Sequence, residues 1–326
     1  MKLQVPFIQL PLAFDAARLA AEVAAIEEAE WMPHPQGMPG NSMLPLIAVN
    51  GDPADEAFAG PMQPTPLLRR CPYLMQVMAS FGAVLGRSRL MRLSGHAEVK
   101  RHADLGYYWR ERVRVHVPIV TQPTVRFDCG DASINMRAGE CWIFDTWRQH
   151  RVINDAVQSR IHLVADTIGG VDFWDLVARG RPDGTALPDW QPRQVGPDGG
   201  SPPTLAYEAV NVPEVMTPWE MGKHLEFLLG EALPHPQLPV LRQHVQRLLT
   251  RWHELWAIHG ERPDGRGYFR GAFNEFSTQV KEPATGVLLQ NQTLWIQAVL
   301  VMLGKIVVAA GATPGAQEQR AMGLNA

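Results

Sequence analysis

Two histidines and one aspartate in the middle of the chain have the side chains that a catalytic metal ion needs. His102 and Asp104 are separated by one residue, and side chains two positions apart in a strand point to the same face. His150 lies in a distant segment and adds a second imidazole. Two imidazoles and one carboxylate form the facial ligand set of non-haem iron(II) oxygenases, which leaves coordination positions open for a co-substrate and dioxygen. The pattern therefore predicts an iron site with ligands from two strands.

Arg160 stands ten residues after His150, which leaves room for one strand to end, turn and return beside it. The guanidinium group presents a fixed fork of donors that matches a carboxylate. Beside the metal, this cation is suited to anchor the far carboxylate of a keto acid whose other end chelates iron. The alternative is that Arg160 belongs to a surface ion pair, which contributes little to stability.

Residues 112–117 and 159–166 alternate polar and apolar side chains, which is typical of a strand with one face toward a polar cavity. In the first segment Arg112, Arg114 and His116 share one face, and three valines share the other. Two cations and an imidazole are too much charge for an ordinary core, so we expect a ligand with an acid group. Alternatively, Arg114 and His116 belong to a polar rim outside the site.

Other polar and aromatic side chains nearby have simpler interpretations. His96 and His162 are interpreted as structural, because a lone histidine in a strand is usually a satisfied core residue. Tyr108 and Trp109 follow Asp104 closely in the sequence. We expect these two rings to wall the substrate pocket, although aromatic side chains at a strand end more often pack in the core.

The motifs taken together are more specific than any of them alone. They are His-x-Asp at 102–104, Arg-x-His at 114–116, Asn-Met-Arg-Ala-Gly-Glu at 135–140, Ile-Phe-Asp at 143–145, His150 and Arg160. This set resembles the aspartyl/asparaginyl β-hydroxylase family, a branch of the 2-oxoglutarate- and Fe(II)-dependent oxygenases. The free-proline 3-hydroxylases of bacteria are its nearest small-molecule relatives. The resemblance covers roughly the middle third of the chain.

The resemblance implies a double-stranded β-helix, the cupin-like jelly roll, with Fe(II), 2-oxoglutarate and dioxygen at its centre. It assigns the metal to His102, Asp104 and His150, and the 2-oxoglutarate to Arg160 with help from His116. It also implies that Arg114 binds a substrate carboxylate. Some animal members of the family lack the carboxylate ligand, whereas this chain has Asp104 as the proline hydroxylases do. The presence of Asp104 therefore favours membership of the bacterial branch, and it argues against an aspartyl residue of a protein as the substrate.

The activity implied by the resemblance is hydroxylation of an unactivated C–H bond, with release of succinate and CO2. The expected substrate is an amino acid or an aspartyl/asparaginyl-type residue in a peptide. Halogenation is disfavoured, because halogenating relatives leave the position of Asp104 empty for halide. One alternative is a jelly-roll protein that binds a metal or a small acid without turnover. Another is a dioxygenase or isomerase that uses the metal without 2-oxoglutarate.

Composition excludes several other classes of function. The formal net charge of −3 provides no basic field for nucleic acid or for an anionic membrane. The odd set Cys71, Cys129 and Cys141 shows no metal-ligand pair spacing, so reduced thiols in the cytoplasm are the simplest interpretation. The N-terminus lacks the charged and apolar regions of a signal peptide, and residues 287–311 are interrupted by polar side chains. We therefore expect a cytoplasmic protein, with neither nucleic acid nor a membrane as its partner.

The pattern of elements predicts a β domain followed by a helical one. Residues 1–178 are expected to form the jelly roll, with support helices at 14–29 and 73–85 and short strands from about 89 to 167. Residues 179–205 are rich in Gly, Pro, Asp and Gln and are expected to form a linker. Residues 206–326 are expected to form a C-terminal helical domain. Its clearest signals are Thr217-Pro218 as a helix start, an apolar stripe over 240–259, and a buried helix over 287–311.

Overall fold

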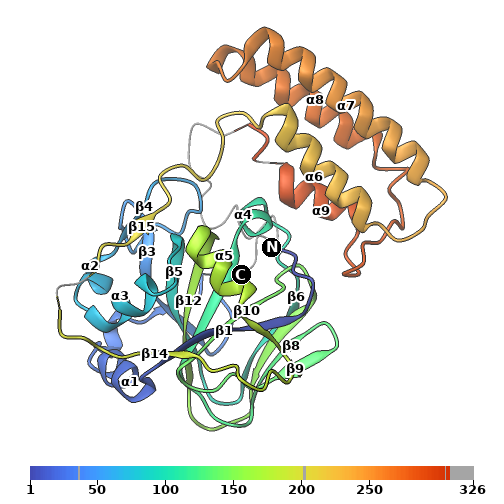
Figure 1. The fold of residues 1–326 in the computed structure, drawn as a ribbon. Helices are drawn as coiled ribbons and strands as arrows, with labels where there is room; N and C mark the ends of the chain where they lie inside the picture. The colour runs from blue at the N-terminus through green and yellow to red at the C-terminus, as the bar shows by residue number, and fades with distance from the viewer. Residues whose placement is uncertain (36, 201–202, 305, 309–326) are drawn as a thin grey trace. The chain divides into compact units, whose positions relative to one another are not determined.

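The computed structural model describes residues 1–35, 37–200, 203–304 and 306–308 (Figure 1). The described residues form two compact units. The first, here called the β unit, consists of Met1–Asp104 and Glu111–Asn211. The second, the helical unit, consists of Leu105–Arg110 and the described residues from Val212 onward. The chain thus enters the helical unit briefly after Asp104 before it completes the β unit.

The centre of the β unit is a jelly roll. Its strands are β5 (Val84–Leu93), β6 (Ala97–His102), β7 (Val113–Val120), β8 (Val125–Cys129), β9 (Ala132–Ile134), β10 (Glu140–Phe144), β11 (His150–Asn154) and β12 (Arg160–Gly169). One sheet contains the order β10-β7-β12-β5 and the other the order β6-β11-β8-β9, and all these pairs are antiparallel. The chain therefore passes back and forth between the sheets, which confirms the predicted double-stranded β-helix.

Further strands widen the larger sheet at both edges. β1 (Phe7–Phe14) pairs with β10, and β3 (Asn41–Val49) pairs with β5. The short strands are β2 (Met32–Pro33) and β4 (Met62–Pro64) on β3, β13 (Arg181–Pro182) and β14 (Arg193–Val195) on β1, and β15 (Ala206–Tyr207) on β5. The helices of this unit are α1 (Ala16–Ala24), η1 (Glu28–Glu30), α2 (Pro66–Arg69), α3 (Pro72–Ala79) and α5 (Val171–Ala178).

The two faces of the larger sheet have opposite characters because side chains alternate along each strand. On β7, Val113, Val115 and Val117 join the main apolar core together with side chains of α1 and α3. On the opposite face of the same strand lie Arg114 and His116, both buried. A second apolar cluster, which includes side chains of both sheets, packs on that polar face. The alternation seen in the sequence therefore places the polar side chains between the two sheets.

The helical unit contains antiparallel helices that bury a row of large side chains. Its helices are α4 (Tyr107–Glu111, except its last residue), α6 (Pro218–Glu231), α7 (Leu238–His259), η2 (Pro263–Gly265), α8 (Arg266–Gln279) and α9 (Trp295–Leu303). The predicted start of α6 is confirmed, because the Thr217 hydroxyl accepts a hydrogen bond from the Glu220 N–H and Pro218 occupies the first turn. Trp252 on α7 is fully buried and donates from its indole to the Met216 carbonyl.

The N-terminal support helices are shorter than the sequence predicts. Phe14 is the last residue of β1, and α1 covers only Ala16–Ala24. The carboxylate of Asp15 accepts from the Arg18 N–H and caps that helix, which explains its start. The second helix ends at Ala79, because Gly82 adopts a positive φ and the chain then enters β5.

Residues 179–205 differ from the expected linker. Two short strands in this segment, β13 and β14, pair with β1, so it belongs to the β unit. Most of the described Gly and Pro residues of this segment lie in loops outside these short strands. The predicted helix over 287–311 is α9 alone, preceded by isolated bridges such as Leu288–Leu294, and residues 305 and 309–311 lie outside the described residues.

The state of the cysteines and the character of the helices bear on the environment predicted for the chain. All three cysteines are free and buried, and burial raises the pKa of Cys71 and of Cys129 to about 12. At neutral pH these thiols are therefore protonated and poorly reactive. Among the described residues, no helix has the length and apolar character needed to cross a membrane.

Candidate metal centre

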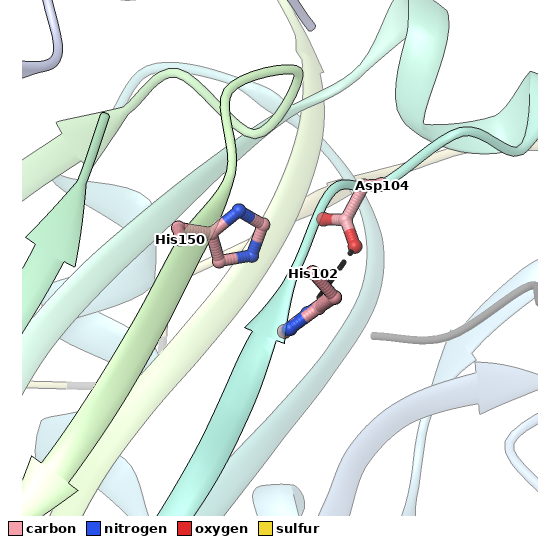
Figure 2. Close-up of side chains that lie close together, drawn as sticks. All are labelled: His102, Asp104 and His150. Carbon is pink, nitrogen blue, oxygen red and sulfur yellow. Dashed lines mark ion pairs between the residues drawn. The ribbon is translucent and has the colours of Figure 1, made fainter. Parts of the chain in front are cut away.

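The three predicted ligands come together at one end of the smaller sheet. His102 is the last residue of β6, His150 is the first residue of β11, and the two are direct cross-strand partners. Asp104 follows two residues after His102, and its backbone N–H donates to the Thr146 carbonyl at 2.9 Å. One ligand atom of each residue lies within 4.8 Å of the others. Figure 2 shows both imidazoles and the carboxylate gathered around one space.

Hydrogen bonds orient both imidazole rings in the same way. The Nδ1 atom of His102 lies 2.7 Å from the Lys100 carbonyl, and that of His150 lies 2.9 Å from the Arg148 carbonyl. A carbonyl only accepts, so Nδ1 carries the proton and Nε2 keeps its lone pair. Metal-binding histidines are usually held in this manner.

Three of the possible ligand atoms in the cluster make no hydrogen bond among the described residues, and this tests whether a metal fits. His102 Nε2 and both carboxylate oxygens of Asp104 are buried and have no hydrogen-bond partner among the described residues. His102 Nε2 and Asp104 Oδ1 are 3.8 Å apart, too far for a hydrogen bond. Buried polar groups are rarely left unpaired, so this donor set fits a divalent cation.

His150 is deeply buried beside aromatic rings. Its ring centroid lies 4.9 Å from that of Phe144 and 4.2 Å from that of His102. Burial, followed by the nearby charge of His102, holds the pKa of His150 well below its usual value. The imidazole is therefore neutral near pH 7, which is the form that ligates a metal.

Arg160, the predicted 2-oxoglutarate residue, is the first residue of β12. It is buried, and its Nε and Nη2 atoms have no hydrogen-bond partner among the described residues. Burial lowers the pKa of Arg160 to about 9, so the guanidinium remains protonated at neutral pH. Buried guanidinium nitrogens without a hydrogen bond are costly, and an anionic ligand would relieve that cost.

His116 and His162 line the same face of the larger sheet as Arg160. Their ring centroids are 5.8 Å apart, and neither ring has a hydrogen-bond partner among the described residues. Burial, followed by the charge of Arg160, holds the pKa of each imidazole well below its usual value. His162, interpreted from sequence as structural, thus lies with the predicted 2-oxoglutarate residues. The sequence signal for this location was the spacing, because a residue two positions after Arg160 in a strand lies on the same face.

Arg114 lies between two buried carboxylates. Its Nη1 atom is 3.4 Å from Asp104 Oδ2, and its Nε atom is 3.1 Å from Asp166 Oδ1. Arg112, expected on the same face, precedes β7 and instead forms a two-pronged ion pair with Glu208, at 2.7 and 3.0 Å. Arg112 immediately precedes the first residue of β7, so its place on the inner face stays a prediction.

The structure adds two buried cations that the sequence patterns did not single out. Arg87 and Arg89 lie on β5, next to His34. Burial, together with the charges of Arg89, Arg87 and Arg114, lowers the pKa of His34 to about 3. The Arg-x-Arg spacing at 87–89 was the available signal, since it places both side chains on one strand face.

The predicted pocket aromatics belong to the helical unit. Tyr108 and Trp109 lie on α4, both are buried, and their ring centroids are 4.7 Å apart in an edge-to-face arrangement. Their role at the substrate stays a prediction. Asp145, by contrast, is a turn residue, because its carboxylate accepts from the Trp147 N–H and from Arg148.

The family model described as "Aspartyl/Asparaginyl beta-hydroxylase" matches residues 58–169. This match confirms the resemblance found in the sequence and includes all three predicted ligands and Arg160. A search of the curated proteins found no significant match.

Similar solved structures include an oxygenase-family oxidoreductase, a prolyl-4-hydroxylase and a protein with 2-oxoglutarate bound. A 2OG-Fe(II) oxygenase family oxidoreductase from Burkholderia pseudomallei is 12% identical, with 48% of this chain and 80% of that chain covered and a TM-score of 0.36. A prolyl-4-hydroxylase from Pseudomonas putida is 16% identical, with 50% and 92% covered and a TM-score of 0.36. HygX from Streptomyces hygroscopicus, with nickel and 2-oxoglutarate bound, is 10% identical, with 50% and 82% covered and a TM-score of 0.36. Only the family match bears on activity.

Proposed function

We propose, from the match of residues 58–169 to the aspartyl/asparaginyl β-hydroxylase family model, that this chain is an Fe(II)- and 2-oxoglutarate-dependent hydroxylase. Its proposed substrate is an amino acid or an aspartyl/asparaginyl-type residue in a peptide. The products are the hydroxylated substrate, succinate and CO2. Bound iron would supply the activation of dioxygen, as the cofactor does in this enzyme class. The protein's share of the reaction is to bind, to orient and to exclude water.

The convergence of unsatisfied donor atoms is the single observation that supports this proposal most directly. His102 Nε2 and the two Asp104 oxygens make no hydrogen bond among the described residues, although Arg114 Nη1 lies 3.4 Å from Oδ2, and His150 completes the set within 4.8 Å. In the proposal these three residues hold the metal. The hydrogen bonds to the Lys100 and Arg148 carbonyls keep the two imidazoles in the ligating tautomer.

The 2-oxoglutarate would be bound by the cation on β12. In the proposal Arg160 donates to the far carboxylate, and its Nε and Nη2 atoms, which make no hydrogen bond among the described residues, gain a charge-assisted pair. His116, on the neighbouring strand, assists from the same face. Because this imidazole is held neutral, it can donate one hydrogen bond to a carboxylate and adds no further charge.

The substrate is proposed to carry an acid group. Arg87, Arg89 and Arg114 are buried, and the positive charge of each lowers the pKa of His34. Such a concentration of guanidinium groups favours an anionic ligand over a neutral one. Arg114, Tyr108 and Trp109 remain the proposed substrate contacts, as the sequence predicts.

The test is an anaerobic titration of the Fe(II)-loaded protein with 2-oxoglutarate, followed by visible absorption. Bidentate chelation of iron by the keto acid should produce a weak charge-transfer band, and amino acids or peptides can then be screened by succinate release. If iron binds and no band forms, the 2-oxoglutarate function is excluded. A jelly roll that binds metal or small acids without this chemistry then becomes the better interpretation.

A further inference from the structure

We infer that Asp166 is a positioning residue for the metal ligand Asp104 and that it acts through Arg114. This inference rests on the proposed metal site, but it assigns a role to a residue that neither the sequence patterns nor the family resemblance singled out. Asp166 lies on β12, six residues after Arg160, and it is 2% exposed.

The three side chains form a continuous buried chain of charges. Asp166 and Arg114 are direct cross-strand partners on β12 and β7, and Asp166 Oδ1 lies 3.1 Å from Arg114 Nε. The other end of the same guanidinium reaches Asp104, with Nη1 at 3.4 Å from Oδ2. The exposed fraction of each side chain is 7% or less, so water screens these interactions poorly.

The two oxygens of Asp104 face different partners. Oδ2 faces Arg114, whereas Oδ1 faces His102 Nε2, the contact drawn as a dashed line in Figure 2. A carboxylate held by one oxygen presents the other to a metal in a defined direction. Arg114 thus selects one orientation of the ligand, and orientation of this kind is what residues behind a metal ligand commonly supply.

Asp104 needs such support because of its place in the chain. It lies beyond the end of β6, where the ladder with β11 no longer restrains it. The hydrogen bond from its N–H to the Thr146 carbonyl fixes the backbone only. The contact with Arg114 ties the side chain to the larger sheet, since β7 and β12 are central strands of that sheet.

Asp166 is required because Arg114 alone would work against a bound metal. A guanidinium close to a divalent cation repels it, and it also draws electron density from the shared carboxylate. The negative charge of Asp166 compensates the guanidinium and fixes its direction through a charge-assisted hydrogen bond. Removing that charge should therefore weaken metal binding even though Asp166 itself does not touch the metal.

The experiment is a titration of metal-free protein with Co²⁺, which reports affinity and, through its visible spectrum, the ligand geometry. We expect Asp166→Asn, which keeps the shape and loses the charge, to weaken Co²⁺ binding by about 10- to 100-fold and to alter the spectrum. Asp175→Asn, an exposed aspartate on α5, is the matched control and should bind like the wild type. Wild-type affinity in Asp166→Asn, whether or not its Tm falls, would overturn the inference.

A double-mutant cycle tests whether the effect passes through Arg114. In an Arg114→Met background, Asp166→Asn should change the Co²⁺ affinity by less than about threefold, because the connecting group is gone. An equal loss in both backgrounds would show that Asp166 acts independently and would contradict the inference. If Asp166→Asn does not fold, Arg114→Lys tests the same link, since one ammonium cannot reproduce the two-sided guanidinium contact. Wild-type affinity in Arg114→Lys would then overturn it.

The same titration separates this inference from the proposed function. If the wild-type protein fails to bind Co²⁺, the proposed metal site itself falls, and the role of Asp166 falls with it. If the wild type binds Co²⁺ and Asp166→Asn binds equally well, only the role of Asp166 is lost.

Discussion

At the scale of single residues, the candidate metal centre is defined by atoms that have no other partner. Both imidazoles use Nδ1 to contact a carbonyl two residues earlier, at Lys100 and at Arg148. This local geometry leaves Nε2 of each ring for a metal and requires no distant residue. The same arrangement at two separate strand ends supports a common function for His102 and His150.

Replacing His150 with alanine should strongly weaken metal binding, because it removes one of the two imidazole ligands of the proposed facial site. We expect the Kd for Co²⁺ to rise by more than about 100-fold, in line with the loss of a direct ligand rather than a supporting residue. Isothermal titration of the metal-free proteins measures this. His253→Ala, on the exposed side of α7, is the control, and wild-type affinity in His150→Ala would exclude the proposed ligand set.

Arg160→Ala should separate the co-substrate site from the metal site. Metal affinity should stay close to that of the wild type, whereas 2-oxoglutarate binding should weaken by about 30-fold or more, the loss typical of a buried charge-assisted pair. The anaerobic titration of the Fe(II)-loaded variant measures this change. Arg126→Ala, which removes a half-exposed arginine of β8, should leave both affinities unchanged. Unaltered 2-oxoglutarate affinity in Arg160→Ala would reject its assigned role.

At the scale of elements, the turn between β5 and β6 packs against the turn between β11 and β12. Both turns lie at the ends of β6 and β11 opposite to the metal ligands. Gly95, between β5 and β6, packs against the turn between β11 and β12. A Cβ atom at this position would lie 2.0 Å from the Val157 carbonyl oxygen. The neighbouring His96 N–H donates to the Ala156 carbonyl at 3.1 Å, so the two turns are also joined by a backbone hydrogen bond.

Gly95→Ala should therefore destabilise the β unit without touching the metal ligands. Forcing a methyl group against backbone costs about 1–3 kcal/mol, which corresponds to a decrease in Tm of several degrees for a unit of this size. Calorimetry of the metal-free protein measures this. Gly196→Ala is the matched control, because no atom lies within 4 Å of the added carbon. Equal Tm values for the two variants would show that the turn contact is unimportant.

At the scale of the whole molecule, the neutral histidines buried between the sheets connect folding with pH. Burial keeps the pKa of His162 well below its usual value in the folded protein. The unfolded chain takes up a proton at this imidazole below about pH 6.5. Unfolding at acid pH is thus favoured by proton uptake, so the free energy of unfolding should fall as the pH decreases from 6.5.

His162→Leu should make the metal-free protein less sensitive to acid. The variant takes up one proton fewer on unfolding. The free energy of unfolding should therefore change less steeply with pH below pH 6.5, by up to about 1.4 kcal/mol per pH unit. Urea unfolding at pH 7.5, 6.0 and 5.0 measures the slope in the variant and the wild type. A slope equal to that of the wild type would contradict the neutral, buried state of His162.

Much of the site and of the fold could be predicted from the sequence, because the relevant signals are local. The alternation in β7 and β12 depends only on the two-residue period of a strand, and it placed Arg114, His116 and Arg160 on the inner face. The ligand set His102, Asp104 and His150 was recognisable from residue type and order. The cap at Thr217 and the apolar stripe of α7 are equally local features.

The partners of the charged residues were decided by the tertiary structure alone. Arg112 pairs with Glu208, and Arg114 is held by Asp166, across separations that no spacing rule covers. The segment 179–205 resembles a linker in composition, yet it supplies two strands to β1. Which residues meet across strands depends on the register and order of the strands, and this is set by the packing of the whole sheet. A short sequence window contains no information about that packing.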